Sequence, residues 1–146
     1  MTESQPLITT TEEETSAAGA RLAPALRAGD VVLLFGELGA GKTAFVRGMA
    51  RGLGASPSEV SSPTFTLIQE YAGERLTLYH VDLFRLEPVE IADLGLDELI
   101  SGGGVVAIEW ADRWPERPTD VVEVRLAHAG EDQRRLEVLT RKTGTT

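Results

Sequence analysis

The sequence contains no cysteine and has few histidines. Without cysteine, the 146-residue chain can form no disulfide framework, thiolate zinc site or cysteine nucleophile. Two histidines leave little for a histidine-based metal site. No run of about 18 apolar residues is present to span a bilayer, and residues 1–5 are polar and acidic, unlike a signal sequence. These absences favour a cytoplasmic protein without a membrane partner.

Basic residues are fewer than acidic ones, since 14 Lys and Arg stand against 23 Asp and Glu, for a formal charge of −9. Affinity for nucleic acids comes mainly from basic side chains that neutralise phosphates, so this balance argues against a protein that holds DNA or RNA by itself. A hydrophobic content of 42% is typical of a globular domain. We expect one domain over residues 6–141, with flexible tails at residues 1–5 and 142–146.

Strand-like and helix-like segments alternate along the chain. Residues 31–35 form a continuous apolar run, which is typical of a strand buried on both faces of a parallel sheet. Either Thr10 with Glu13 or Thr11 with Glu14 has the spacing of a capping box, so a helix is expected from there to about Leu26. Further segments are a helix at 42–53, hairpins at 64–71 with 76–83 and at 121–127 with 134–140, short helices at 88–94 and 96–100, and a strand at 105–108. The pattern predicts an α/β fold with a mixed, mostly parallel central sheet, flanked by helices and carrying antiparallel hairpins.

Residues 36–43, GELGAGKT, match the phosphate-binding pattern Gly-x-x-x-x-Gly-Lys-Ser/Thr. The match lies directly after a buried strand and directly before a helix, as the chemistry requires. Backbone amides of such a loop wrap the phosphates, a lysine adds a cation, and a hydroxyl binds Mg²⁺. The residues in these roles are Glu37, Leu38, Gly39, Ala40 and Gly41 for the amides, Lys42 for the cation and Thr43 for the metal. The motif predicts a P-loop NTPase-like domain, against the alternative of a glycine-rich turn that carries a lysine by chance.

Two carboxylates stand where a P-loop protein needs an acidic partner for its metal, at the ends of apolar strands. Asp82 closes residues 78–82, and Glu109 closes residues 105–109. Either could hold Mg²⁺ or orient the attacking water, and either could be an ordinary strand-end group. Thr64 lies between the P-loop and Asp82, where its hydroxyl or backbone could meet the metal or the γ-phosphate. His80 is interpreted as a packed strand histidine rather than a catalytic base.

Five segments, in this order, resemble the bacterial TsaE (YjeE) family. They are GELGAGKT at 36–43, SPTFTL at 62–67, YHVDLFRL at 79–86, DLG at 93–95 and IEW at 108–110. The resemblance spans about residues 7 to 140, and the succession of segments makes it far more specific than the P-loop alone. Phe84 departs from the pattern, because the family usually has Tyr there.

The resemblance implies an ATPase subunit that is needed for threonylcarbamoyladenosine modification of tRNA. Such a subunit binds ATP and Mg²⁺, acts on a TsaB–TsaD complex rather than performing the transfer, and meets tRNA only indirectly. Carried over, Lys42 and the backbone of residues 37–43 bind phosphates, and Thr43 and Glu109 hold Mg²⁺. Asp82 holds the metal or orients water, and Thr64 reports the nucleotide state. Hydrolysis is expected to be slow for the protein alone.

Two other functions share a P-loop. A small-molecule or nucleotide kinase usually adds an arginine-rich lid, and no insertion of that size is visible. A non-hydrolysing ATP-dependent binding module would bind its partner according to nucleotide but release no phosphate. A Ras-like GTPase is excluded because the chain has no Asn, and the guanine-reading Asn-Lys-x-Asp motif therefore cannot exist.

Overall fold

The computed structural model describes residues 7–36, 41–55, 68–84, 86–130 and 132–141. Within them, the strands are β1 (Leu7–Thr9), β2 (Val31–Gly36), β3 (Ile68–Tyr71), β4 (Leu78–Asp82), β5 (Val105–Glu109), β6 (Val121–His128) and β7 (Arg134–Arg141). They form one seven-stranded sheet in the order β1-β7-β6-β2-β5-β4-β3. The four central strands β6, β2, β5 and β4 pair in parallel, and the outer ones pair antiparallel. The predicted mixed, mostly parallel sheet is confirmed.

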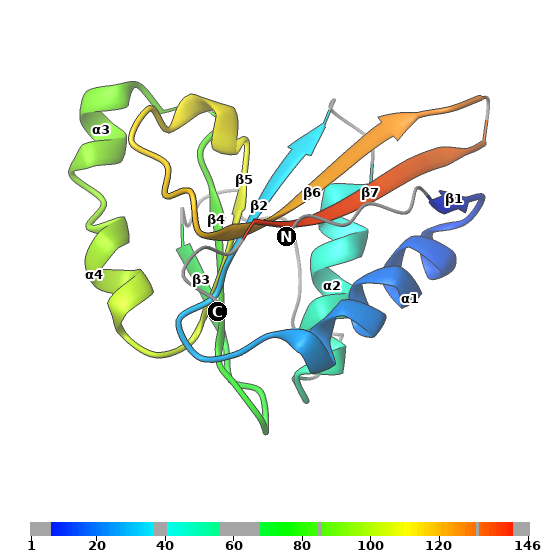
Figure 1. The fold of residues 1–146 in the computed structure, drawn as a ribbon, viewed down its shortest axis with the longest axis horizontal. Helices are drawn as coiled ribbons and strands as arrows, with labels where there is room; N and C mark the ends of the chain where they lie inside the picture. Colours follow the sequence, from blue (N-terminus) through cyan, green and yellow to red (C-terminus); the bar gives the residue numbers. More distant parts are fainter. Residues whose placement is uncertain (1–6, 37–40, 56–67, 85, 131, 142–146) are drawn as a thin grey trace.

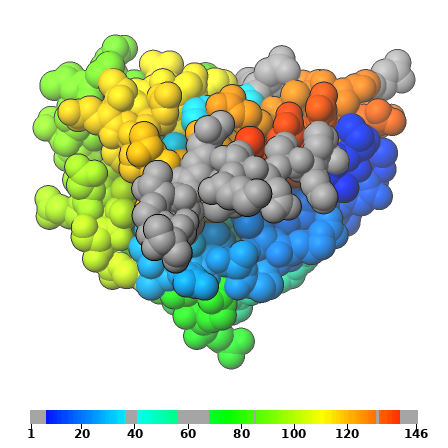
Figure 2. Space-filling model, in the orientation of Figure 1, coloured from blue at the N-terminus to red at the C-terminus, as the bar shows by residue number. Residues whose placement is uncertain are grey.

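Two pairs of helices lie on opposite faces of this sheet (Figure 1). The helices are α1 (Glu12–Leu22), α2 (Lys42–Gly52), α3 (Pro88–Ala92) and α4 (Leu96–Ser101). Helices α1 and α2 cover one face, and the shorter α3 and α4 cover the other. In the space-filling view, the α3–α4 region (green to yellow-green) and the β6–β7 hairpin (orange to red) lie on opposite sides of the molecule (Figure 2).

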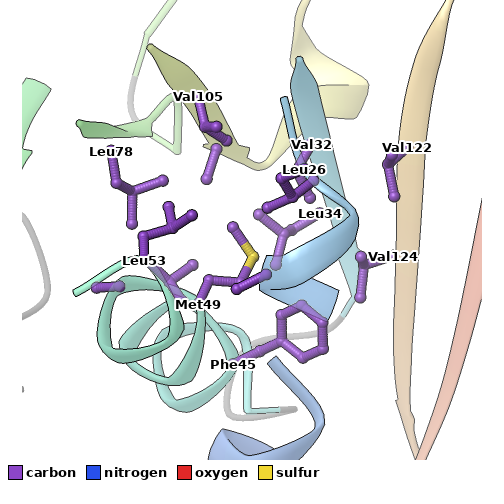
Figure 3. Close-up of a cluster of buried hydrophobic side chains, with 14 of the residues drawn as sticks. Leu26, Val32, Leu34, Phe45, Met49, Leu53, Leu78, Val105, Val122 and Val124 are labelled. Carbon is purple, nitrogen blue, oxygen red and sulfur yellow. The ribbon is translucent and has the colours of Figure 1, made fainter. Parts of the chain in front are cut away.

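Strand β2 separates two hydrophobic cores, because successive side chains of a strand point to opposite faces. Val32 and Leu34 point toward α1 and α2, whereas Val31 and Leu33 point toward α3 and α4. On the α1–α2 face, Phe45 and other side chains of α2 pack against the strands (Figure 3). The continuous apolar run at residues 31–35 therefore belongs to a strand that is buried on both faces, as the sequence predicted.

Helices α1 and α2 pack backbone against backbone at glycines. A Cβ added at Gly48 would lie 1.7 Å from the carbonyl oxygen of Ser16, and one added at Gly19 would lie 2.1 Å from that of Phe45. Any side chain there would push the helices apart. This contact fixes α1 against the helix that begins at the phosphate-binding motif.

The first helix begins at one of its two predicted starts but ends earlier than predicted. The Thr11 hydroxyl accepts a hydrogen bond from the amide of Glu14, as in a capping box. The Glu14 carboxylate, however, accepts from the amide of Thr10 rather than from that of Thr11. The α-helix ends at Leu22 instead of Leu26 and continues as a 3₁₀ turn, because Pro24 has no amide hydrogen for the next helical bond.

Both predicted hairpins are present, since β3 pairs antiparallel with β4, and β6 with β7. The part of the first hairpin over residues 64–67 lies outside the described residues. Across the ranges that the structure describes, no helix is long and apolar enough to cross a membrane.

Candidate functional site

The phosphate-binding motif lies between β2 and α2, with Gly36 and Gly41 at its two ends. A Cβ at Gly36 would lie 2.5 Å from the carbonyl oxygen of Leu126 on β6, so only glycine lets these strands come this close. Gly41 has φ of +100°, in the left-handed region, and directly precedes the first turn of α2. The helix thus presents its free amides at the carboxyl end of the sheet. Glu37, Leu38, Gly39 and Ala40 lie outside the described residues.

Lys42, the first residue of α2, is almost completely buried. Its Nζ donates a hydrogen bond of 2.6 Å to the carbonyl oxygen of Gly36 and lies 4.2 Å from the centre of the Trp110 ring. The ammonium group is therefore held between the end of β2 and the residue that follows β5. Thr43, beside it in the first turn, is half-buried.

Trp110, which directly follows β5, has an unusual backbone conformation and contacts residues from two other parts of the chain. It has φ of +59° and is the only residue other than glycine with positive φ in the described ranges. Such a backbone costs energy and is found mainly where surrounding contacts impose it. The ring lies against Lys42 on one hand and against Phe84 on the other, with the two ring centres 4.7 Å apart. Phe84, which departs from the family pattern, makes an aromatic contact that needs no hydroxyl.

Asp82 and Glu109 are neighbours, because they are register partners at the carboxyl ends of the parallel strands β4 and β5. Alternation along each strand places both on the α1–α2 face, the same face as Leu78 and Val105. The structure thus brings both predicted carboxylates to the edge of the sheet at which Lys42 begins α2.

Burial raises the pKa of the Asp82 carboxyl above its ordinary value, and the charge of Glu109 acts in the same direction. The amide of Phe84, which donates to Asp82 Oδ1 at 2.9 Å, and the ammonium of Lys42 lower that pKa in part. Two neighbouring carboxylates form a pair that a divalent cation would stabilise.

Glu109 also contacts His80, which is completely buried two residues before Asp82 on β4. The His80 Nε2 and Glu109 Oε2 are 2.5 Å apart. The other ring nitrogen, Nδ1, has no hydrogen-bond partner among the described residues.

The donors at this edge are oxygen atoms, the class that Mg²⁺ prefers: two carboxylates and the Thr43 hydroxyl. Mg²⁺ in nucleotide sites usually takes only one or two carboxylates, with water and phosphate oxygens completing its shell. The described ranges hold no group of three or more His, Cys, Asp or Glu side chains that could hold a metal. The residues present fit a magnesium ion carried in with a nucleotide. Thr64 lies outside the described residues.

A family model for the threonylcarbamoyl adenosine biosynthesis protein TsaE matches residues 9–136. The chain belongs to the TsaE family. Two relatives named tRNA threonylcarbamoyladenosine biosynthesis protein TsaE come from Nostoc sp. and Bacillus subtilis. The first is 44% identical over 131 residues, covering 87% of this chain and 80% of the relative. The second is 45% identical over 129 residues, covering 88% of this chain and 80% of the relative.

A solved structure gives the same assignment for the fold. The crystal structure of B. subtilis YdiB superposes with a TM-score of 0.76 and 34% identity, covering 97% of this chain and 88% of that one. The predicted P-loop NTPase-like α/β fold and the resemblance to the TsaE family are both confirmed.

Sequence reasoning missed the contact between His80 and Glu109 and the contacts of Trp110. One signal was available for His80, because residues two apart on a strand share a face, which puts His80 on the same side as Asp82. Its pairing with Glu109 required knowing that β4 and β5 are adjacent. Nothing in the sequence indicated the left-handed backbone of Trp110.

Proposed function

We propose that this TsaE-family chain is a Mg²⁺-dependent ATP-binding and hydrolysing subunit required for threonylcarbamoyladenosine modification of tRNA. It acts on a TsaB–TsaD complex and does not itself perform the transfer. The observation that carries the proposal is the meeting of Lys42 with the register pair Asp82 and Glu109 at one edge of the sheet. The names of the relatives, all tRNA threonylcarbamoyladenosine biosynthesis proteins, support the biological role.

In the proposed mechanism, Lys42 leaves the Gly36 carbonyl and the Trp110 ring and turns to the β- and γ-phosphates. The free amides at the start of α2 bind phosphate oxygens. Thr43 and Glu109 would hold Mg²⁺, and Asp82 would share that role or orient the attacking water. The metal, when bound, supplies charge neutralisation for phosphoryl transfer.

Slow turnover by the protein alone follows from what these groups provide. Phosphoryl transfer depends on positioning and on neutralising the charge that develops, and an added arginine often contributes several orders of magnitude. Arg47, on α2, lies 3.9 Å from Glu12 on α1. An arginine or a conformational constraint from the partner complex would then accelerate hydrolysis.

The test is phosphate release from ATP by the purified protein, with and without Mg²⁺, alone and with the TsaB–TsaD pair. We expect turnover well below the enzyme median of about 10 per second for the protein alone, and a higher rate with the pair. Lys42→Ala should reduce the rate by about 100-fold or more. Arg51→Ala, at the exposed end of the same helix, is the matched control and should leave the rate unchanged.

Other outcomes would select another function. Transfer of the γ-phosphate to an acceptor other than water would indicate a kinase. Nucleotide-dependent binding to the pair without phosphate release under any condition would indicate a non-hydrolysing module. If the TsaB–TsaD pair left the rate of phosphate release unchanged, the proposal that the chain acts on that complex would lose its support.

A further inference from the structure

The histidine that contacts Glu109 occupies a place where an apolar side chain would be expected. His80 is completely buried on β4, which lies between β3 and β5, and points to the same face as Leu78. Burying a polar ring costs free energy unless its hydrogen bonds are made, and one of its two nitrogens has no partner in the described part of the chain. This free-energy cost indicates that the ring is present for the hydrogen bond that its other nitrogen makes with Glu109.

The chemistry of the contact fixes which nitrogen carries the hydrogen. An ionised carboxylate only accepts hydrogen bonds, so the nitrogen that faces Glu109 Oε2 must be the donor. In a neutral ring that donor is Nε2, and Nδ1 is then bare.

We propose that His80 is a positioning residue of the nucleotide site, which fixes the Glu109 carboxylate through a hydrogen bond from Nε2–H to Oε2. This inference rests on the proposed function, in which Glu109 holds the metal. Its carboxylate ends a flexible side chain, and a donor on the neighbouring strand sets the plane of that carboxylate before any ligand arrives. One oxygen is thereby engaged, and the other remains for the metal. Partners of this kind behind metal-binding side chains typically contribute 10- to 100-fold in metal affinity or activity.

The first test needs no nucleotide. The chain has two histidines, so ¹⁵N-histidine labelling gives two rings, and an exposed-site variant, His128→Gln, assigns them. Long-range proton–nitrogen correlations of the wild-type protein should show hydrogen on Nε2 of His80, and Glu109→Gln should shift that resonance. Hydrogen on Nδ1 alone, or a His80 signal that Glu109→Gln leaves unchanged, would overturn the proposal.

The second test separates positioning from packing. His80→Met removes the donor at similar volume, whereas His80→Gln retains an N–H donor of similar reach. We expect His80→Met to lower kcat about 10- to 100-fold and to raise the Mg²⁺ concentration for half-maximal rate, with KM for ATP nearly unchanged. His80→Gln should restore most of both quantities. Leu78→Met, a packing change on the same strand and face, should lower only the melting temperature.

Failure of this inference and failure of the proposed function are distinguishable. If the wild-type protein releases no phosphate with or without partners, the proposed function fails, while the tautomer measurement still decides the hydrogen bond. If the wild type is active and His80→Met loses only thermal stability, as Leu78→Met does, His80 is a packing residue. Should His80→Met fail to fold, the wild-type and Glu109→Gln spectra alone decide the outcome.

Discussion

The two faces of the sheet bury different kinds of side chain. Against α3 and α4, the buried hydrophobic cluster has Leu33, Ile91 and Ile108 among its members. Against α1 and α2, an apolar cluster of similar kind is joined by buried polar groups. Among the described residues they include Thr9, Thr15, Ser16, Lys42, His80 and Glu109.

The difference indicates what each face does. Apolar packing is sufficient to hold helices on a sheet, as the α3–α4 face illustrates. Polar groups buried on the other face lower stability unless each is paired, and sites that depart from folding rules in this way are commonly functional. The roles of the two faces can be tested separately, because two adjacent residues of one strand point to opposite faces and can be substituted one at a time.

The largest expected effect is on stability, at the contact between α1 and α2. Gly48→Ala places a Cβ 1.7 Å from the Ser16 carbonyl oxygen, so the helices must separate. We expect a loss of about 3 kcal/mol or more in the free energy of unfolding, measured by urea denaturation. The matched change near the other face is Gly102→Ala, at the end of α4, where the nearest atom would lie 3.2 Å away. Equal losses of stability in the two variants would contradict the close packing of α1 on α2 at Gly48.

The next effect compares two adjacent residues of β5. Glu109→Gln should lower the rate of Mg²⁺-dependent ATP hydrolysis about 100-fold, because it removes a negative charge from the proposed metal site. Ile108→Val, one residue earlier and on the α3–α4 face, should cost about 1 kcal/mol of stability and leave the rate within about twofold. Steady-state kinetics and thermal unfolding of both variants provide the comparison. Normal hydrolysis by Glu109→Gln would contradict the assignment of chemistry to the α1–α2 face.

The smallest effect is a pH dependence of stability. The pKa of Asp82 is raised in the folded protein, chiefly by burial. The folded state therefore binds more protons than the unfolded state between the two pKa values, and the free energy of unfolding falls as pH rises through that window. The loss persists at neutral pH.

Asp82→Asn removes this loss while keeping an oxygen that accepts from the Phe84 amide. The ligand-free variant should be more stable than wild type at neutral pH and equal to it in acid below the window. Urea unfolding across this pH range measures the difference, with the exposed Asp132→Asn as control. If the stability gained by Asp82→Asn over wild type increased as the pH fell, the prediction would be contradicted.

Local patterns in the sequence predicted the parts of the fold that depend on neighbours along the chain. The apolar run of β2, the glycine and lysine of the motif before α2, and the turn between β6 and β7 all carry their signal within a few residues. The exit from α1 was misplaced because a proline inside a helix-tolerant segment ends the α-helix but permits a 3₁₀ turn.

The candidate site was predictable only in part, for the same reason. Lys42 was predicted from the motif before α2, and Asp82 and Glu109 from the ends of apolar strands. The contacts among them depend on the order of the strands in the sheet. Parallel strands are connected through long crossover segments, so the spacing of residues along the chain does not reveal which residues are paired. The ring of His80 and the left-handed backbone of Trp110 became visible only with the sheet assembled.

The central claim is that the carboxyl edge of the sheet on the α1–α2 face binds ATP together with Mg²⁺. Calorimetric titration of the wild-type protein with ATP, with and without Mg²⁺, tests it most directly, beside Asp82→Asn and the control Asp132→Asn. We predict one site per chain, bound at least about tenfold more tightly with Mg²⁺, a difference of about 1.4 kcal/mol. Asp82→Asn should lose that gain where Asp82 holds the metal and keep it where Asp82 orients the water, and Asp132→Asn should keep it in both cases. Absence of binding, or equal affinity with and without Mg²⁺ in the wild type, would contradict the account.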